Sequence, residues 1–297
     1  MSEQYQIVFP LAVGWPRLAN QMFQYAVSQL LALRTDSKVV LDKNRLNSGM
    51  FSFHKYFKNL DFVTEYNQGI LQNNCKRFKE TKEFELIPEI HNMTSLNTNI
   101  ILEGWFQNSE YFVGKEDYIK HLFQFNDDIV KKADENINII KNLRPGKQIV
   151  SFHLRRPDTK DDKSFIYTVY YKRHIQDLLN KFDKDKTVFL IFTSDIQDTT
   201  EKLLDCFIGY DYSFVTDNEA ISLCMMTKCN HNIIGASSYS WWGAYLNKNP
   251  NKRVIIPSPW FSPISTQSSN YVNGLYLKDW EVYDMKDYMK DLFSQSS

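Results

Sequence analysis

The pattern of hydrophobic and polar positions is clearest in the second half of the chain. Five short runs rich in β-branched and aromatic residues have the length of β-strands, and segments with helical spacing lie between them. The runs are QIVSFHL (148–154), TVFLIFT (187–193), DYSFV (211–215), HNIIGA (231–236) and KRVIIP (252–257). Largely apolar strands that alternate with helices are typical of a parallel sheet covered on both faces. The second half is therefore predicted to be Rossmann-like.

The first half repeats the strand and helix alternation less regularly. Strands are predicted over 5–13, 38–42 and 99–106. After the loop GWPRLA, Asn20 is predicted to cap a helix whose apolar stripe runs from Met22 to Leu31. Most of the chain between the second and third of these strands gives no assignable pattern.

The two halves are predicted to be separate domains, 1–144 and 145–297. A chain of 297 residues exceeds the roughly 100–200 residues of one domain. Pro145 and Gly146, in the segment KNLRPGKQ, interrupt both patterns and mark the linker. The predicted fold class is α/β.

Composition and charge argue against several classes of protein. The 35 basic residues balance 35 acidic ones, so the chain lacks the positive charge by which proteins attract nucleic acid. No signal-peptide pattern opens the sequence and no apolar run approaches about 18 residues, so we expect a cytoplasmic protein without a transmembrane segment. The four cysteines form no C-x-x-C pair, which argues against a zinc site and a disulfide framework.

Polar side chains gather directly after three of the predicted strands. They are His153, Arg155, Arg156 and Asp158 after the first strand of the second half, Ser194 and Asp195 after the second, and Ser237, Ser238 and Ser240 after the fourth. The carboxyl ends of parallel strands share one edge of a sheet, and ligands bind in the crevice at that edge. We therefore expect these three clusters to lie together.

The chemistry of the three clusters fits a nucleoside diphosphate. Paired arginines suit phosphate oxygens, and the serines precede the helix SWWGAYL, whose free N–H groups could hold the same anion. Asp195 could accept N–H donors from a base or bind a ribose hydroxyl; the alternative is that it caps a helix. Trp241 and Trp242, at the start of the SWWGAYL helix, are expected to be core residues.

Five motifs occur in an order that resembles the α-1,2-fucosyltransferases of glycosyltransferase family 11. They are LANQMFQYAVSQLLAL, ILEGWFQNSEYF, VSFHLRRPD, FLIFTSDI and HNIIGASSYSWWGAYLN. The resemblance implies a GT-B-like fold of two Rossmann-like domains facing across a cleft, the first on the acceptor side and the second binding the GDP-sugar. It further implies inverting transfer of fucose from GDP-fucose to a glycan, at O2 of a galactoside, with no metal or cofactor.

The resemblance also suggests roles for single residues. Arg156 is expected on the phosphates, Asn20 and Gln21 at the donor, and Glu103 and Trp105 at the acceptor. Candidates for the catalytic set are Arg156, His153, Asp158 and Asn20. An asparagine cannot itself take the acceptor's proton, and the general base stays open between the histidine and the carboxylates.

Two departures from the family pattern bear on activity. Ala19 and Pro157 stand where the family has glycines, and both substitutions restrict the backbone. Two alternatives to a fucosyltransferase therefore stay open: a binding protein that has lost turnover, and a transferase that uses another nucleotide sugar.

An Asp-x-Asp sequence, of the kind that binds a metal in other glycosyltransferases, occurs at Asp183 to Asp185. It precedes the strand TVFLIFT, so we expect it at the amino end, about 20 Å from the anion site. The sequence therefore predicts a transferase that needs no metal.

Overall fold

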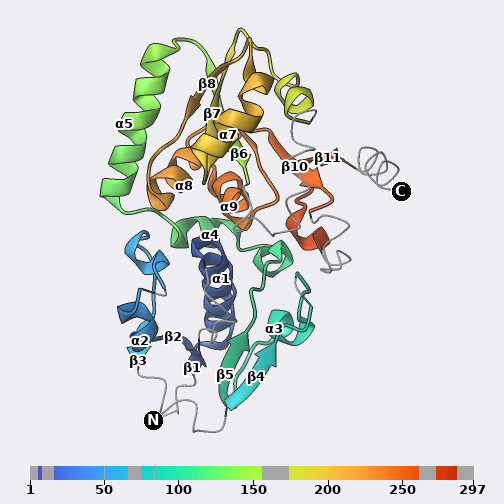
Figure 1. Cartoon of the computed structure of the whole chain (residues 1–297). Helices are drawn as coiled ribbons and strands as arrows, with labels where there is room; N and C mark the ends of the chain where they lie inside the picture. The colour runs from blue at the N-terminus through green and yellow to red at the C-terminus, as the bar shows by residue number, and fades with distance from the viewer. Residues whose placement is uncertain are drawn as a thin grey trace. The chain divides into compact units, whose positions relative to one another are not determined.

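The computed structural model describes residues 6–8, 17–49, 51–65, 75–82, 84–155, 174–260 and 272–285. The chain forms two compact units (Figure 1). The first comprises Met1–Asn126 and Asn270–Leu277, and the second comprises Asp127–Ser269 and Lys278–Ser297. Each contains its own parallel sheet, so the predicted α/β class with two Rossmann-like parts is confirmed. Arg156, Pro157 and Asp158 lie outside the described residues.

The first unit is built on a five-stranded parallel sheet with the order β3-β2-β1-β5-β4. Its strands are β1 (Gln6–Val8), β2 (Lys38–Asp42), β3 (Val63–Glu65), β4 (Cys75–Lys79) and β5 (Asn99–Glu103). Its α-helices are α1 (Leu18–Thr35), α2 (Lys43–Asn47), α3 (Pro88–Asn92) and α4 (Glu116–Leu122), and its 3-10 helices are η1 (Phe53–Lys55), η2 (Ser109–Phe112) and η5 (Val272–Leu275).

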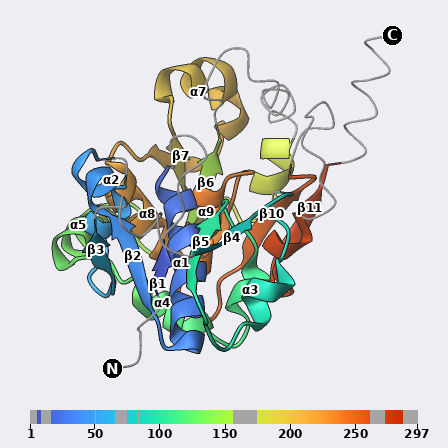
Figure 2. The same cartoon turned by 90° about the horizontal axis from the view of Figure 1, so that it is seen from below.

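Helix α1 is buried along most of its length, because it packs on β1 and β2 (Figure 2) and is also contacted by η1 and η2. Burial on both sides requires partners for its polar side chains. The Gln21 Oε1 atom accepts from the backbone N–H groups of Ser52 and Phe53, at 2.9 and 3.2 Å. The Gln24 Nε2 atom donates to the Gly104 carbonyl at 2.7 Å. The helix therefore holds two loops of its own unit.

The second unit is built on a six-stranded parallel sheet with the order β11-β10-β9-β6-β7-β8. Its strands are β6 (Gln148–Leu154), β7 (Thr187–Thr193), β8 (Asp211–Phe214), β9 (His231–Ile233), β10 (Val254–Ser258) and β11 (Glu281–Asp284). Its helices are α5 (Asp127–Leu143), α7 (Ile196–Leu203), η4 (Leu204–Phe207), α8 (Glu219–Thr227) and α9 (Ser238–Leu246), and residues 174–179 are also helical. Counted from β6, the strand order is that of a doubly wound nucleotide-binding sheet.

The predicted domain boundary at 144/145 is wrong, because helix α5 belongs to the second unit. Its buried residues Ile129, Ala133 and Ile137 form one stripe, and α5 packs against α8. The Lys228 Nζ atom lies 2.6 Å from the Asp134 carboxylate and fastens the two helices. The segment 270–277 is predicted to lie in the second domain, but in the structure it belongs to the first unit.

The predicted strands that the structure describes coincide with its strands, and the differences lie at their ends; the run predicted from 252, for example, begins at Val254 as β10. The strands predicted over 148–154 and 187–193 are β6 and β7, with the same bounds. Strand β9 ends at Ile233, two residues before Gly235, and β5 ends at Glu103, directly before Gly104. Helix α1 begins at Leu18 with Arg17 in the N-cap position, so the prediction that Asn20 caps it is wrong. In the part of the chain that the structure describes, no helix combines the length and the apolar character needed to span a membrane.

Candidate active site

The described residues of the three polar clusters lie at one edge of the second unit's sheet, as the sequence predicts. Leu154, at the end of β6, pairs with Thr193 at the end of β7, and Phe152 of β6 pairs with Ile233 of β9. The residues that follow these three strands therefore emerge side by side. From β6 the chain proceeds to β7 on one side, and β9 lies on the other. The direction of winding reverses between β6 and β9, which is where doubly wound folds bind their ligands.

Gly235 brings the ends of β6 and β9 into close contact. A methyl group at this position would lie 2.9 Å from the carbonyl oxygen of His153 and 3.3 Å from Cβ of Arg155. A backbone oxygen has little freedom to move away, so any side chain here would push the two loops apart. Gly235 is not among the predicted site residues, although a lone glycine inside a predicted strand is a signal of close backbone approach.

The amino end of α9 faces the same edge. Ser237 is the N-cap residue, yet its side chain makes no capping hydrogen bond, and Ser238 opens the helix. N–H groups in the first turn of a helix form an anion site. Ser240 is buried, and its hydroxyl donates to the Ser237 carbonyl at 3.2 Å. The hydroxyl of Ser240 therefore supports the turn, and Ser237 and Ser238 stand nearer the edge.

Trp241 and Trp242 are fully buried, which confirms that they are core residues. Their rings pack edge-to-face, with centroids 5.2 Å apart, and Trp241 also stacks on Tyr245 at 4.8 Å. The two indoles thus fix α9 from within the unit.

His153 is the most perturbed titratable group at this edge. Burial, and secondarily the charge of Arg155, lowers the pKa of His153 to about 3. Its Nδ1 atom is buried and has no hydrogen-bond partner among the described residues. The imidazole is therefore neutral at ordinary pH. An imidazole with so low a pKa is a poor proton acceptor, so a role as general base is disfavoured.

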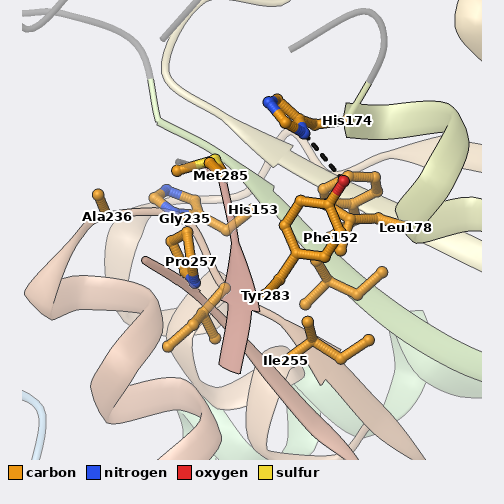
Figure 3. A pocket seen from close by; sticks show the side chains of 12 residues that line it. Phe152, His153, His174, Leu178, Gly235, Ala236, Ile255, Pro257, Tyr283 and Met285 are labelled. Carbon is orange, nitrogen blue, oxygen red and sulfur yellow. Dashed lines mark hydrogen bonds between the residues drawn. The ribbon is translucent and has the colours of Figure 1, made fainter. Parts of the chain in front are cut away.

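A recess opens beside His153 at the ends of β6, β9, β10 and β11 (Figure 3). Its lining is largely apolar, with Phe152, Leu178 and Ile255 on one side. The phenol of Tyr283 donates to the Asp177 carboxylate at 3.0 Å and lies 2.9 Å from Nδ1 of His174. Since the Tyr283 hydroxyl donates its one proton to Asp177, Nδ1 of His174 is the donor in the hydrogen bond between His174 and Tyr283.

Asp195 caps helix α7. One carboxylate oxygen accepts from the backbone N–H of Asp198 at 2.8 Å, and the Asp195 carbonyl accepts from the Thr199 hydroxyl at 2.6 Å. The capping alternative is thus realised at the position where the sequence suggested nucleoside recognition. Asp195 and Ser194 are both exposed at the end of β7. The second oxygen of the Asp195 carboxylate can therefore still accept a hydrogen bond from a ligand.

We expect Asp195→Ala to lower the free energy of unfolding by about 1 kcal/mol, because an N-cap is lost. Asp195→Asn should unfold like the wild type, since asparagine caps equally well. If the carboxylate also reads the nucleoside, both variants bind GDP more weakly. Melting curves beside calorimetric GDP titrations check this; wild-type GDP affinity in Asp195→Asn would remove the residue from the binding site.

In the first unit, the residues suggested for the donor and acceptor are held by their neighbours. The Asn20 Oδ1 atom accepts from Nε2 of Gln107 at 3.1 Å, in the first turn of α1. Gln21 is buried and supports the 52–53 loop, as described above. Trp105 is partly exposed, after the end of β5.

Glu103 is engaged by two cations at the ends of β4 and β5. Its carboxylate lies 2.8 Å from Nζ of Lys79 and 2.9 Å from Nη1 of Arg77. Hydrogen bonds from Lys79 and Arg77 hold the pKa of Glu103 below its usual value. A carboxylate in this state is a weak base, and both of its oxygens already accept hydrogen bonds.

Acidic residues do not converge on a metal position in the part of the chain that the structure describes: no three His, Cys, Asp or Glu side chains form such a group. The Asp-x-Asp sequence lies in a turn before β7. There the Asp183 Oδ1 atom accepts from the N–H of Asp185 at 3.0 Å, and Asp183 pairs with Lys186. This turn is at the amino end of the strand, as predicted.

Comparison with known proteins places this geometry in a family. The model of "Glycosyl transferase family 11" matches residues 12–291. The O-antigen biosynthesis glycosyltransferase WbnK of Escherichia coli is 26% identical over 293 residues, covering 82% of this chain and 92% of the relative. The α-1,2-colitosyltransferase of Escherichia coli is 26% identical over 281 residues, covering 86% and 92%.

The fold has a counterpart among solved structures. The α-1,6-fucosyltransferase NodZ, co-crystallised with GDP, matches with a TM-score of 0.52 at 12% identity, over 82% of this chain and 92% of that one. The likeness supports the GT-B fold class that the motifs imply. Since the family model covers nearly all of the 297 residues, the chain belongs to glycosyl transferase family 11.

Proposed function

We propose that this protein transfers fucose from GDP-fucose to O2 of a galactoside in a glycan, with inversion and without a metal ion. The observation that carries this proposal is the switch point between β6 and β9, where the winding of the sheet reverses. Arg155 follows β6 there, with Arg156 next in the sequence, Gly235 allows close approach, and α9 presents its first turn. These are the features that a nucleoside diphosphate requires.

The reaction is a substitution at the anomeric carbon of the sugar. The acceptor oxygen forms a bond to the anomeric carbon while the bond from this carbon to the β-phosphate oxygen breaks. The electron pair of the broken bond leaves with GDP. Negative charge therefore grows on the β-phosphate in the transition state. Arg156, Arg155 and the N–H groups of Ser238 and its neighbours would stabilise this charge in the place of a metal ion.

The acceptor's proton must pass to a base. The low pKa of His153 and the two cations on Glu103 disfavour both residues. Asn20 has no basic group and would instead orient a phosphate or the acceptor. Among the sequence candidates we therefore favour Asp158, which follows the arginine pair in the sequence.

A second donor deserves a direct comparison because one relative is an α-1,2-colitosyltransferase. Colitose is fucose without the hydroxyl at C3. A site that hydrogen-bonds this hydroxyl rejects the deoxy sugar by about 10⁴-fold, whereas an apolar site discriminates by only about 10²-fold or less. The ratio of kcat/KM for the two donors therefore identifies the sugar for which the pocket is built.

The proposal is tested by incubating the protein with GDP-fucose or GDP-colitose and galactose-terminated acceptors, with and without excess EDTA. We expect a product linked at O2 of galactose, formed at the same rate in chelator, because the arginines supply the positive charge. Activity abolished by EDTA and restored by Mg²⁺ would contradict the metal-free site. GDP binding without transfer or hydrolysis of either donor would favour the binding-protein alternative.

A further inference from the structure

The first unit has its own switch point at the carboxyl edge of its sheet. Strand β1 lies between β2, which follows it in the chain, and β5 on the other side, so the winding reverses between β1 and β5. The chain after β5 forms the loop Gly104–Gln107, and the first turn of α1 belongs to the connection that follows β1. By the rule for open sheets, a ligand of this unit contacts these two segments.

The loop Gly104–Gln107 is fastened at successive positions. The Gly104 carbonyl accepts from Gln24, and one oxygen of the Glu80 carboxylate accepts from the N–H groups of Trp105 and Phe106, at 2.6 and 3.1 Å. Phe106 is fully buried and has φ +52°, a left-handed conformation that a bulky residue adopts only when its surroundings impose it. The loop is therefore a fixed support for Gln107.

The side chain of Gln107 uses this support to contact Asn20, across 87 residues of sequence. Its Nε2 atom donates to the Asn20 Oδ1 atom at 3.1 Å. We propose that Gln107 is a positioning residue for the transfer reaction, which fixes the orientation of the Asn20 amide. The inference rests on the proposed function, in which Asn20 contacts the substrates.

The hydrogen bond determines which end of the Asn20 amide faces the ligand. With its carbonyl oxygen turned to Gln107, the two N–H donors of Asn20 are directed to the other side of the group. Oxygen atoms of a phosphate or a sugar hydroxyl accept such donors. If the amide were free to turn over, half of its orientations would present an oxygen to these oxygens, and substrate binding would lose its alignment.

A double-mutant cycle between Gln107→Met and Asn20→Ala tests the proposal. Methionine keeps the shape of glutamine without its hydrogen bond, and we expect kcat/KM to fall about 10-fold to 100-fold. In the Asn20→Ala background the same change should alter kcat/KM less than twofold, because the residue that it positions is absent. An equal loss in both backgrounds, or no loss in the wild type, would overturn the proposal.

Gln124→Met is the matched control. Gln124 lies in the same unit and is also paired with an asparagine, since its Oε1 atom accepts from Nδ2 of Asn59 at 3.0 Å. We expect it to leave kcat/KM unchanged. Similar losses in Gln124→Met and Gln107→Met would mean that general loosening of the unit is the cause, and would overturn the positioning role.

The side-chain amide signals in the ¹⁵N NMR spectrum give a readout that needs no turnover. The Asn20 signals, assigned by their loss in Asn20→Ala, should shift in Gln107→Met and stay in place in Gln124→Met. A wild-type protein that transfers neither sugar would refute the proposed function, and the spectrum would then decide on the hydrogen bond alone. Asn20 signals that do not shift in Gln107→Met would overturn the inference, whatever reaction the protein catalyses.

Discussion

Replacing Arg156 with alanine should lower kcat/KM for transfer from GDP-fucose by a factor of about 10²–10³. This is the loss that follows removal of one preorganised donor to developing charge. Arg156 follows β6, the strand at which the sheet's winding reverses, and it belongs to the His-x-Arg-Arg block that the family resemblance places on the phosphates. The formal neutrality of the chain makes this local charge more important, because no general positive field attracts the donor.

Arg144→Ala provides the control for Arg156→Ala. Arg144 precedes the same strand, at the opposite edge of the sheet, where its guanidinium lies 3.4 Å from the half-buried carboxylate of Asp211. Its loss removes the same formal charge, and we expect kcat/KM within twofold of the wild type. Steady-state kinetics with GDP-fucose distinguish the two variants. Wild-type kcat/KM in Arg156→Ala would show that another group stabilises the leaving GDP.

Gly235→Ala should weaken GDP binding by about 10-fold to 100-fold. The added methyl group would lie 2.9 Å from the His153 carbonyl, so the loops after β6 and β9 must separate, and a shift near 1 Å at a reacting group costs about that factor. Crowding of a packed region also costs about 1–3 kcal/mol of stability. Calorimetric titration with GDP measures the first effect, and a melting curve measures the second.

Gly146→Ala separates loss of binding from loss of stability. Gly146 has φ +77° and no atom near the position of a new Cβ, so alanine strains the backbone by about 1–2 kcal/mol without crowding any neighbour. It lies in the turn before β6, at the edge opposite the site. We expect reduced stability with unchanged GDP affinity. Equal affinities of Gly235→Ala and the wild type would mean that the strand ends tolerate separation.

The second sheet and the edge of the candidate site could be predicted because the strands of this sheet have a clear hydrophobic pattern. Strand β7, for example, is buried at six of its seven positions, which makes a continuous apolar run. Once the strands are parallel, their direction alone brings Arg155, Asp195 and Ser238 to one edge. By contrast, strand β4 has a single buried residue, Phe78, and such a strand leaves no hydrophobic pattern to detect.

The roles of polar residues on α1 could not be predicted because they depend on loops that return from elsewhere. Asn20 and Gln21 have the chemistry of ligand-binding residues, and the sequence does not show that the loops at 52–53 and 104–107 lie against them. Helix α5 had a usable signal, since Ile129, Ala133 and Ile137 recur every four residues. Its many charged positions obscured that stripe.

Residues 270–277 belong to the first unit, so this unit is begun first during synthesis of the chain but is completed only near the end. Leu275 is fully buried there, and the Gly274 carbonyl accepts from the Ser109 hydroxyl at 2.5 Å. Gly274 also packs against the Asn108 side chain with no space for a methyl group. A ribosome that has made the first 126 residues has therefore not yet supplied the segment that closes this core. Nor can the first unit be exchanged as a contiguous module between relatives, because a chimera must carry 270–277 with it.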